Sequence, residues 1–130
     1  MKKLLIVFLL SVISALSFSQ LKTGYEIDIN IRGLKDSSIY LAYHLGDKQY
    51  IKDTIRLDQS GYGRISGMES LPQGIYMIVL PGRKYFEILI SEDQHFALNC
   101  FYNDYFNTLK FSGSEENSAF IEYQRKWMTM

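Results

Sequence analysis

The stretch YEIDINIR, residues 25–32, alternates between apolar and polar side chains at every position. The odd positions carry one tyrosine and three isoleucines, and the even positions carry Glu26, Asp28, Asn30 and Arg32. A period of two is typical of a β-strand that buries one face and exposes the other to water. The stretch therefore predicts a half-buried strand, and an all-β fold if the same pattern continues along the chain.

The pattern does continue, with turn residues between the apolar runs. It predicts further strands at 38–45, 51–57, 62–67, 75–80, 85–90, 95–102 and 108–112. On the third strand of the chain, Ile51, Ile55 and Leu57 should share one face. The run 75–80 is apolar without alternation, which is typical of a central strand covered on both faces. Seven or eight strands at this spacing predict an antiparallel β-sandwich or partly open barrel. No long crossover helix separates them, so we expect no parallel pairing.

The period changes near the end of the sequence. Ser114 offers a capping hydroxyl, and acidic residues follow it in the first turn, where the helix dipole favours them. Phe120, Tyr123 and Trp127 recur at helical spacing, so they should form one apolar stripe. We therefore expect a β-domain over 20–113 and an amphipathic C-terminal α-helix over 114–130. Because apolar residues reach almost to the last position, we also expect this helix to be cut short and its stripe to favour association.

The first nineteen residues have the organisation of a secretory signal peptide. Lys2 and Lys3 precede an apolar run over 4–13, and Ser17 and Ser19 flank Phe18 in the small-x-small pattern that signal peptidase recognises. The run is shorter than the roughly 20 residues that a membrane-spanning helix needs. We expect cleavage after Ser19, no membrane span in the mature protein, and a location in the periplasm or cell envelope. No cysteine follows the run directly, so a lipoprotein is not expected.

Composition excludes several classes of protein. The sequence has 14 basic and 14 acidic residues and 47% hydrophobic residues, which is typical of a folded domain and not of a disordered one. A net charge of zero gives no electrostatic reason to expect nucleic acid as a partner. A single cysteine excludes an internal disulfide, a C-x-x-C redox pair and a cysteine-based zinc cluster.

Few residues are candidates for chemistry. Cys100 lies in phase with Phe96 and Leu98, so it should be buried and unreactive. His44 and His95 have no second ligand at metal-binding spacing and should be surface residues. Asp58 fits a hairpin turn better than a calcium loop. We therefore predict no catalytic, metal-binding or cofactor-binding residues and no enzymatic activity; a redox role for Cys100 is the weakest alternative.

The aromatic content, with ten tyrosines, is the compositional exception. Tyr40, Tyr50 and Tyr76 need not share the core phase of their neighbours. A tyrosine-bearing sheet face could stack sugars or bind a protein, but tyrosine also simply suits half-buried strands. Both explanations remain open at this point. The predicted interaction surface thus combines these tyrosines with the helical stripe of Phe120, Tyr123 and Trp127.

Three segments carry a resemblance to a known family. They are KDTIRLDQSG at 52–61, LPQGIY at 71–76, and the helix start GSEEN at 113–117 with Phe120 and Tyr123 beyond it. Together they resemble the N-terminal domain of unknown function that precedes a thioredoxin-fold domain in exported thiol–disulfide interchange and peroxiredoxin-like proteins of the Bacteroidota. The segment around Gly63 departs from the family, which usually has an aromatic-x-aromatic strand there.

The resemblance implies an accessory role. In such proteins the redox chemistry belongs to a downstream domain with a C-x-x-C motif, and this sequence contains no such motif. We therefore predict a non-catalytic accessory or interaction domain of an exported thioredoxin-like protein, without cofactors and with a protein as its partner. The alternative is a free-standing exported module that binds a glycan or a peptide.

Overall fold

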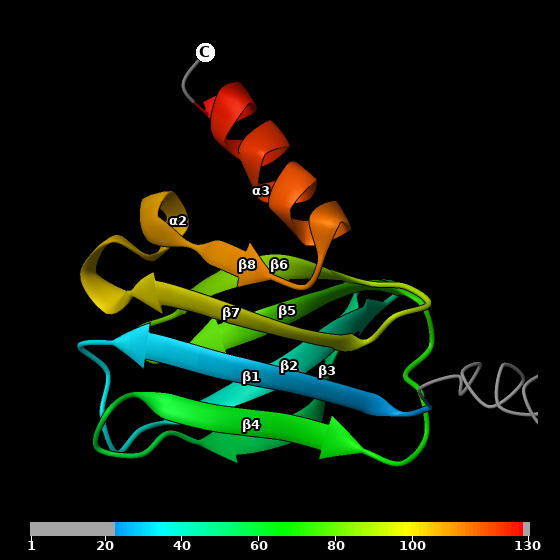
Figure 1. Ribbon diagram of the computed structural model, residues 1–130, viewed down its shortest axis with the longest axis horizontal. Coiled ribbons are helices and arrows are strands. Elements are labelled where there is room, and N and C mark those ends of the chain that lie inside the picture. Colours follow the sequence, from blue (N-terminus) through cyan, green and yellow to red (C-terminus); the bar gives the residue numbers. More distant parts are fainter. Residues whose placement is uncertain (1–22, 129–130) are drawn as a thin grey trace, which may run out of the picture.

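The alternating stretch forms strand β1 (Tyr25–Arg32), and the side chains of Ile27, Ile29 and Ile31 are completely buried. In the computed structural model, residues 23–128 are described (Figure 1). The predicted signal peptide, 1–19, lies outside the described residues. Polar residues alternate with these isoleucines, so β1 buries one face as the sequence predicted.

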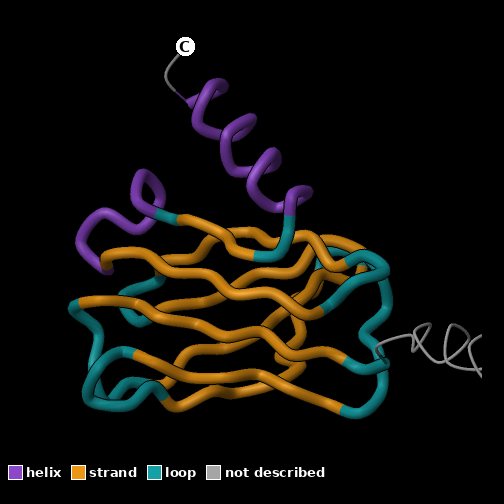
Figure 2. Tube along the Cα trace, viewed as in Figure 1, coloured by secondary structure: helices purple, strands orange, loops and turns teal. Residues whose placement is uncertain are grey.

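The described residues form eight strands in two four-stranded sheets, so the predicted all-β architecture is confirmed. Both sheets are open, which makes the fold a sandwich and not a closed barrel within this part of the chain (Figure 2). One sheet has the order β4-β1-β7-β8 and the other β3-β2-β5-β6, and a single apolar core fills the space between them. The remaining strands are β2 (Ser38–Leu45), β3 (Lys48–Arg56), β4 (Tyr62–Gly67), β5 (Gly74–Leu80), β6 (Lys84–Ile90), β7 (His95–Phe101) and β8 (Lys110–Ser112).

The expectation that no strands pair in parallel was wrong. β1 and β7 are parallel neighbours, with Ile27 beside Phe96 and Ile31 beside Cys100. A parallel pair needs a long connection, which is usually a helix. Here the chain between the two strands passes twice through the opposite sheet, as β2–β3 and as β5–β6, and forms β4 of the first sheet in between. These strands take the place of a crossover helix.

A β-bulge changes the phase of β3. The register with β2 steps from Leu41 opposite Asp53 to Ala42 opposite Ile51, which leaves Lys52 as an extra residue. Each extra residue reverses the alternation that follows it. Ile51 is therefore 64% exposed, and the prediction that it shares a buried face with Ile55 and Leu57 was wrong at this position.

The predicted central position of β5 is confirmed, because β5 lies between β2 and β6. Between β7 and β8 the structure adds a short 3-10 turn, η2 (Tyr102–Asp104), and a one-turn helix, α2 (Tyr105–Thr108), neither of which was predicted. No helix among residues 23–128 has both the length and the apolar character that crossing a membrane requires.

The predicted C-terminal helix is present as α3 (Glu115–Met128). The Ser114 hydroxyl accepts a hydrogen bond from the backbone N–H of Asn117 at 3.3 Å, which is the expected cap. The side of α3 that faces the sandwich carries Asn117 and Ile121, both buried, and in the next turn Arg125. Tyr123 and Trp127 are 58% and 61% exposed, so most of the predicted apolar stripe points away from the core.

Candidate functional site

The aromatic groove

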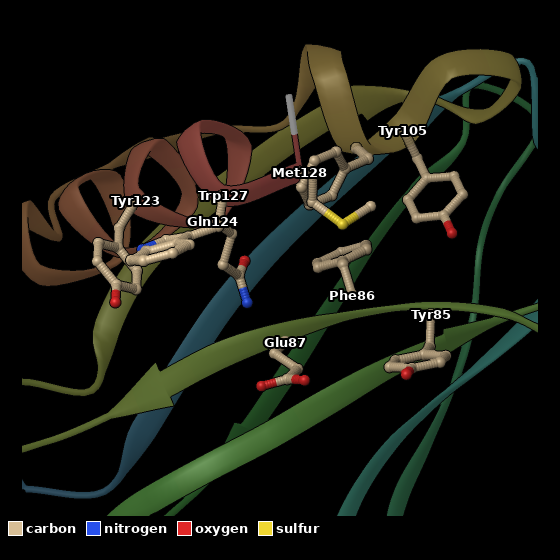
Figure 3. Close-up of a pocket in the computed structure, with 9 residues that line it drawn as sticks. Tyr85, Phe86, Glu87, Tyr105, Tyr123, Gln124, Trp127 and Met128 are labelled. Atoms are coloured by element: carbon tan, nitrogen blue, oxygen red, sulfur yellow. The ribbon is translucent and has the colours of Figure 1, made fainter. Parts of the chain in front are cut away.

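A groove lies between β6, α2 and α3 (Figure 3). Figure 1 shows that these helices lie on one side of the sandwich. We call it the aromatic groove, because six of its nine lining residues have aromatic rings. Its volume is about 550 Å³, and its lining consists of Tyr85, Phe86, Glu87, Tyr105, Phe106, Tyr123, Gln124, Trp127 and Met128. Glu87 is the only charged residue among them, so the groove has an apolar wall with one carboxylate.

Asn117 fixes the first turns of α3 against β6. Its side-chain Nδ2 donates to the backbone oxygen of Leu89 at 2.9 Å, and its Oδ1 accepts from the backbone N–H of Leu89 at 2.7 Å. The same Nδ2 also donates to the Ser114 hydroxyl. Asn117 is buried, and its carboxamide is hydrogen-bonded at both ends, as a buried polar group must be. The contact therefore sets the position of α3 along the strand.

Arg125 attaches the later turns of α3 to the segment that contains α2. Its Nε donates to the backbone oxygen of Phe106 at 3.0 Å, and its Nη2 donates to the backbone oxygen of Leu109 at 2.7 Å. Hydrogen bonds from a charged donor are stronger than those between neutral groups. With Asn117 at one end and Arg125 nearer the other, α3 holds its outer residues in fixed positions over the groove.

Four of the six aromatic rings of the groove form two pairs. Tyr123 and Trp127 meet edge to face with ring centroids 5.9 Å apart, and across the groove Phe86 and Tyr105 are 6.3 Å apart and tilted. Such pairs are stabilising beyond the area they bury. Figure 3 shows side chains from α3 and from β6 bordering the same space. The groove is thus an ordered apolar surface that is still exposed to solvent.

The predicted tyrosine residues

The structure does not bring Tyr40, Tyr50 and Tyr76 together on one surface. Tyr50 stacks on Tyr43 at 5.6 Å, and Tyr43 contacts Tyr76 at 6.1 Å, which makes a row of rings across β3, β2 and β5. Tyr76 is a core residue: its hydroxyl donates to the backbone oxygen of Pro72 at 2.7 Å, and burial raises its pKa. Tyr40 pairs with Val79, on the other face of the sheet.

Of the second predicted group, Tyr123 and Trp127 line the aromatic groove, and Phe120 is half-buried and lies outside it. The aromatic groove also contains four rings that the sequence did not point to, on β6 and in the segment of α2. Their spacing along the chain gives no sign that they meet the helix. Only the fold brings them together.

Candidate reactive and metal-binding residues

Cys100 is buried, as predicted, with 1% of its surface exposed. Burial raises the pKa of its thiol to about 12, because the surroundings solvate the thiolate poorly. A thiol reacts as a nucleophile only in its thiolate form. At neutral pH, Cys100 therefore remains a protonated core side chain.

The histidines differ from each other. His44 is exposed, as predicted, whereas His95 is partly buried with its Nδ1 3.5 Å from the carboxylate of Asp93. Within residues 23–128, no three His, Cys, Asp or Glu side chains are grouped closely enough to hold a metal ion. Asp58 caps the predicted turn: its Oδ1 accepts from the backbone N–H groups of Ser60 at 2.8 Å and Tyr62 at 3.0 Å.

Two buried carboxamides were missed from the sequence. Gln94 binds the backbone of Leu71 with its side-chain oxygen at 2.8 Å and its nitrogen at 2.9 Å, in the same manner as Asn117 binds Leu89. Gln94 was interpreted as part of a polar connection and Asn117 as an ordinary first-turn residue. The one available signal for Asn117 was its place three residues after the capping serine.

Comparison with known proteins

The sequence model of one protein family, described as Domain of unknown function (DUF4369), matches residues 25–120. The matched segment runs from the first residue of β1 into α3 and includes Asn117. No curated protein and no solved structure matches the chain. The association with thioredoxin-fold proteins that the resemblance implied stays a prediction. Because the match covers most of its length, the chain belongs to the DUF4369 family of domains of unknown function.

Proposed function

We propose that this chain is a non-catalytic accessory domain that binds the thioredoxin-fold domain of an exported thiol–disulfide interchange protein through the aromatic groove. The observation that carries the proposal is the exposure of Tyr123 and Trp127 beside an apolar groove. Tyrosine and tryptophan are the residues most enriched at the energetic centres of protein interfaces. An exposed apolar patch of this kind is typical of an interaction site.

The way α3 is held supports binding. Asn117 and Arg125 fix the helix by hydrogen bonds to the backbone of β6 and of the α2 segment. A surface that is ordered before binding loses less conformational entropy when the partner arrives. The Tyr123–Trp127 pair is already in an edge-to-face arrangement, so a partner meets a preformed site.

The non-catalytic part of the proposal rests on Cys100. A thiol–disulfide exchange reaction needs an accessible thiolate. Burial and the raised pKa of Cys100 oppose both requirements. In this proposal the partner supplies the redox chemistry, and the present domain positions the partner or contributes to its specificity.

We further propose that the protein is exported, with cleavage between Ser19 and Gln20. This would place it in the compartment where disulfide chemistry is common. Mass spectrometry of the envelope fraction should find a mature chain that begins at Gln20. An intact N-terminus on protein recovered from the cytoplasm would contradict the proposed export.

The alternative function, a free-standing glycan- or peptide-binding module with a tyrosine-lined sheet face, has less support. Such a face needs its tyrosines on one exposed surface. Tyr76 is buried, and Tyr40 and Tyr50 lie on opposite sides of their sheet. The aromatic groove, by contrast, gathers six aromatic rings around one exposed space.

Isothermal titration calorimetry tests the proposal. The mature protein is titrated with the thioredoxin-fold domain of an exported thiol–disulfide interchange protein from the same organism. Trp127→Ser and Tyr123→Ser should each weaken binding by about tenfold or more, as expected for residues at an interface centre. Tyr50→Ser is the matched control, because Tyr50 is also an exposed tyrosine but lies on β3, away from the aromatic groove.

Binding that is unchanged in both groove variants would contradict the proposal, as would the absence of binding to such a domain. Both groove variants should keep the unfolding midpoint of the wild-type protein. Surface substitutions that leave the core intact usually change stability by about 0.5 kcal/mol or less. This separates loss of a contact from loss of the fold.

A further inference from the structure

The β6 strand is an edge strand, because β5 is its only strand neighbour in the described sheet. In an antiparallel pair, successive residues direct their backbone N–H and C=O groups alternately toward the partner strand and away from it. The backbone of Leu89 points away from β5, since both its N–H and its oxygen are bound by Asn117. Because the direction alternates along a strand, this contact also fixes where the backbone N–H and C=O groups of the remaining β6 residues point.

Tyr85 and Glu87 have the same phase as Leu89, so their backbone groups also point away from β5. Among residues 23–128, no backbone or side-chain group pairs with these outward N–H and C=O groups. Both residues line the aromatic groove (Figure 3). One border of the groove is therefore a strand edge with two consecutive sets of unpaired backbone groups.

We propose that this free edge accepts an extended segment of the partner protein, which adds to the sheet as a strand beside β6. The inference rests on the proposed function for the identity of the partner, but not for the site. Backbone donors and acceptors at a two-residue spacing are matched by an extended peptide, which is the basis of β-strand addition. The carboxamide of Asn117 makes the same pair of hydrogen bonds to Leu89 that one residue of an added strand would make.

The groove also selects the side chains of the added segment. Alternate residues of a strand point to opposite faces, so one set would lie against the rings of Phe86 and Trp127 and should be apolar. Glu87 makes no ion pair among the described residues, and an opposite charge directly across a strand pair is stabilising. A segment that alternates apolar with basic residues fits both features.

A synthetic octapeptide of alternating valine and lysine, with blocked termini, serves as the probe. It is added to isotopically labelled mature protein, and amide resonances are followed by NMR. The signals of Tyr85 and Glu87 should shift, and their hydrogen exchange should slow by about tenfold or more, because exchange requires the new bonds to open. A peptide with proline at its two central positions lacks the donors and should produce neither effect.

Two variants at one position separate the backbone from the side chain. Glu87→Pro removes an N–H that β5 does not use, and edge strands tolerate proline there. Glu87→Ala keeps the N–H and removes only the carboxylate. Glu87→Pro should weaken peptide binding by about tenfold or more, and Glu87→Ala by roughly threefold or less. If Glu87→Pro lowers the unfolding midpoint, this variant is set aside. The amide shifts of the wild-type protein and the comparison with the proline-containing peptide then test the inference.

Shifts confined to other residues, equal binding by the two variants, or pairing of β6 with a second copy of the chain would each overturn the inference. Failure of the proposed function can be distinguished from failure of strand addition. If the thioredoxin-fold domain binds but the Tyr85 and Glu87 amides do not respond to either ligand, strand addition is wrong and docking stands. If the peptide adds to β6 and the thioredoxin-fold domain does not bind, the partner is wrong and the site stands.

Discussion

Two buried carboxamide side chains in this fold bind backbone N–H and C=O groups that no neighbouring strand pairs with. Asn117 and Gln94 each bind both the N–H and the oxygen of one backbone residue, Leu89 and Leu71 respectively. A buried backbone group without a partner costs about 1–3 kcal/mol, which such a carboxamide avoids. Because the two bound leucines are distant in sequence from their partners, this role cannot be inferred from local patterns.

At Gly61 the turn requires a residue without a side chain. Its φ is +77°, and a Cβ there would collide with the backbone oxygens of Ile31 and Leu34. Gly46 also has a positive φ, +66°, but faces open space. Gly46→Ala should therefore cost about 1 kcal/mol from backbone strain alone, and Gly61→Ala about 3 kcal/mol because the collision is added.

Urea unfolding of the two glycine variants measures this difference. The larger loss should belong to Gly61→Ala, with the slope of the transition unchanged. Equal losses in the two variants would show that the close approach of the Ile31 carbonyl is not a constraint on the turn.

The Cys100 thiol should be unreactive in the folded protein. Its pKa is raised by burial to about 12, so the thiolate is scarce at pH 8, and the side chain is inaccessible. A thiol reagent at pH 8 should label the native protein slowly and the urea-unfolded protein at the rate of a free cysteine. Rapid labelling of the native protein would contradict the buried, non-catalytic assignment.

At the scale of elements, local patterns predicted most of the strands. β1 and β2 begin and end at the predicted residues, because strict alternation and the following glycine turns are local signals. The outward position of Ile51 was not predictable, since the bulge that produces it depends on pairing with β2. Similarly, the parallel contact of β1 with β7 depends on the path of the chain through the second sheet.

At the candidate site, the helix α3 likewise has features that local patterns predict and features that depend on contacts with distant elements. Helical spacing correctly placed Tyr123 and Trp127 on one side of α3, and both side chains are exposed, as an uncovered stripe should be. A pattern identifies a face, and the contacts of neighbouring elements decide whether it is buried. The face that packs is the one with Asn117, Ile121 and Arg125, where only Ile121 is apolar, so hydrophobicity alone did not identify the packed face.

Asn117→Ala should separate α3 from the strand edge. The variant loses the side-chain hydrogen bond to the Ser114 hydroxyl and leaves the Leu89 N–H and oxygen without a partner, so the free energy of unfolding should fall by about 1–3 kcal/mol. Glu116→Ala, at an exposed neighbouring position, should change it by about 0.5 kcal/mol or less. Chemical denaturation followed by circular dichroism compares the two. Indistinguishable midpoints would contradict the anchoring role of Asn117.

At the scale of the whole molecule, the sandwich serves as a rigid support and the groove lies at its edge. The family match covers the sandwich and the start of α3, whereas Tyr123 and Trp127 follow the matched segment. The anchor of the helix thus belongs to the matched domain, and the groove residues on α3 lie beyond it. We expect the partner's contacts with these residues to contribute to specificity.

Trp127 is the only tryptophan in the sequence, and it lies in the aromatic groove with most of its surface exposed. Its fluorescence therefore reports on this site alone. Titration with the thioredoxin-fold domain should move the emission maximum to shorter wavelength and reach saturation, because docking removes the indole from water. If calorimetry detects binding while the emission of Trp127 stays unchanged, the partner binds elsewhere and the groove is not the docking surface.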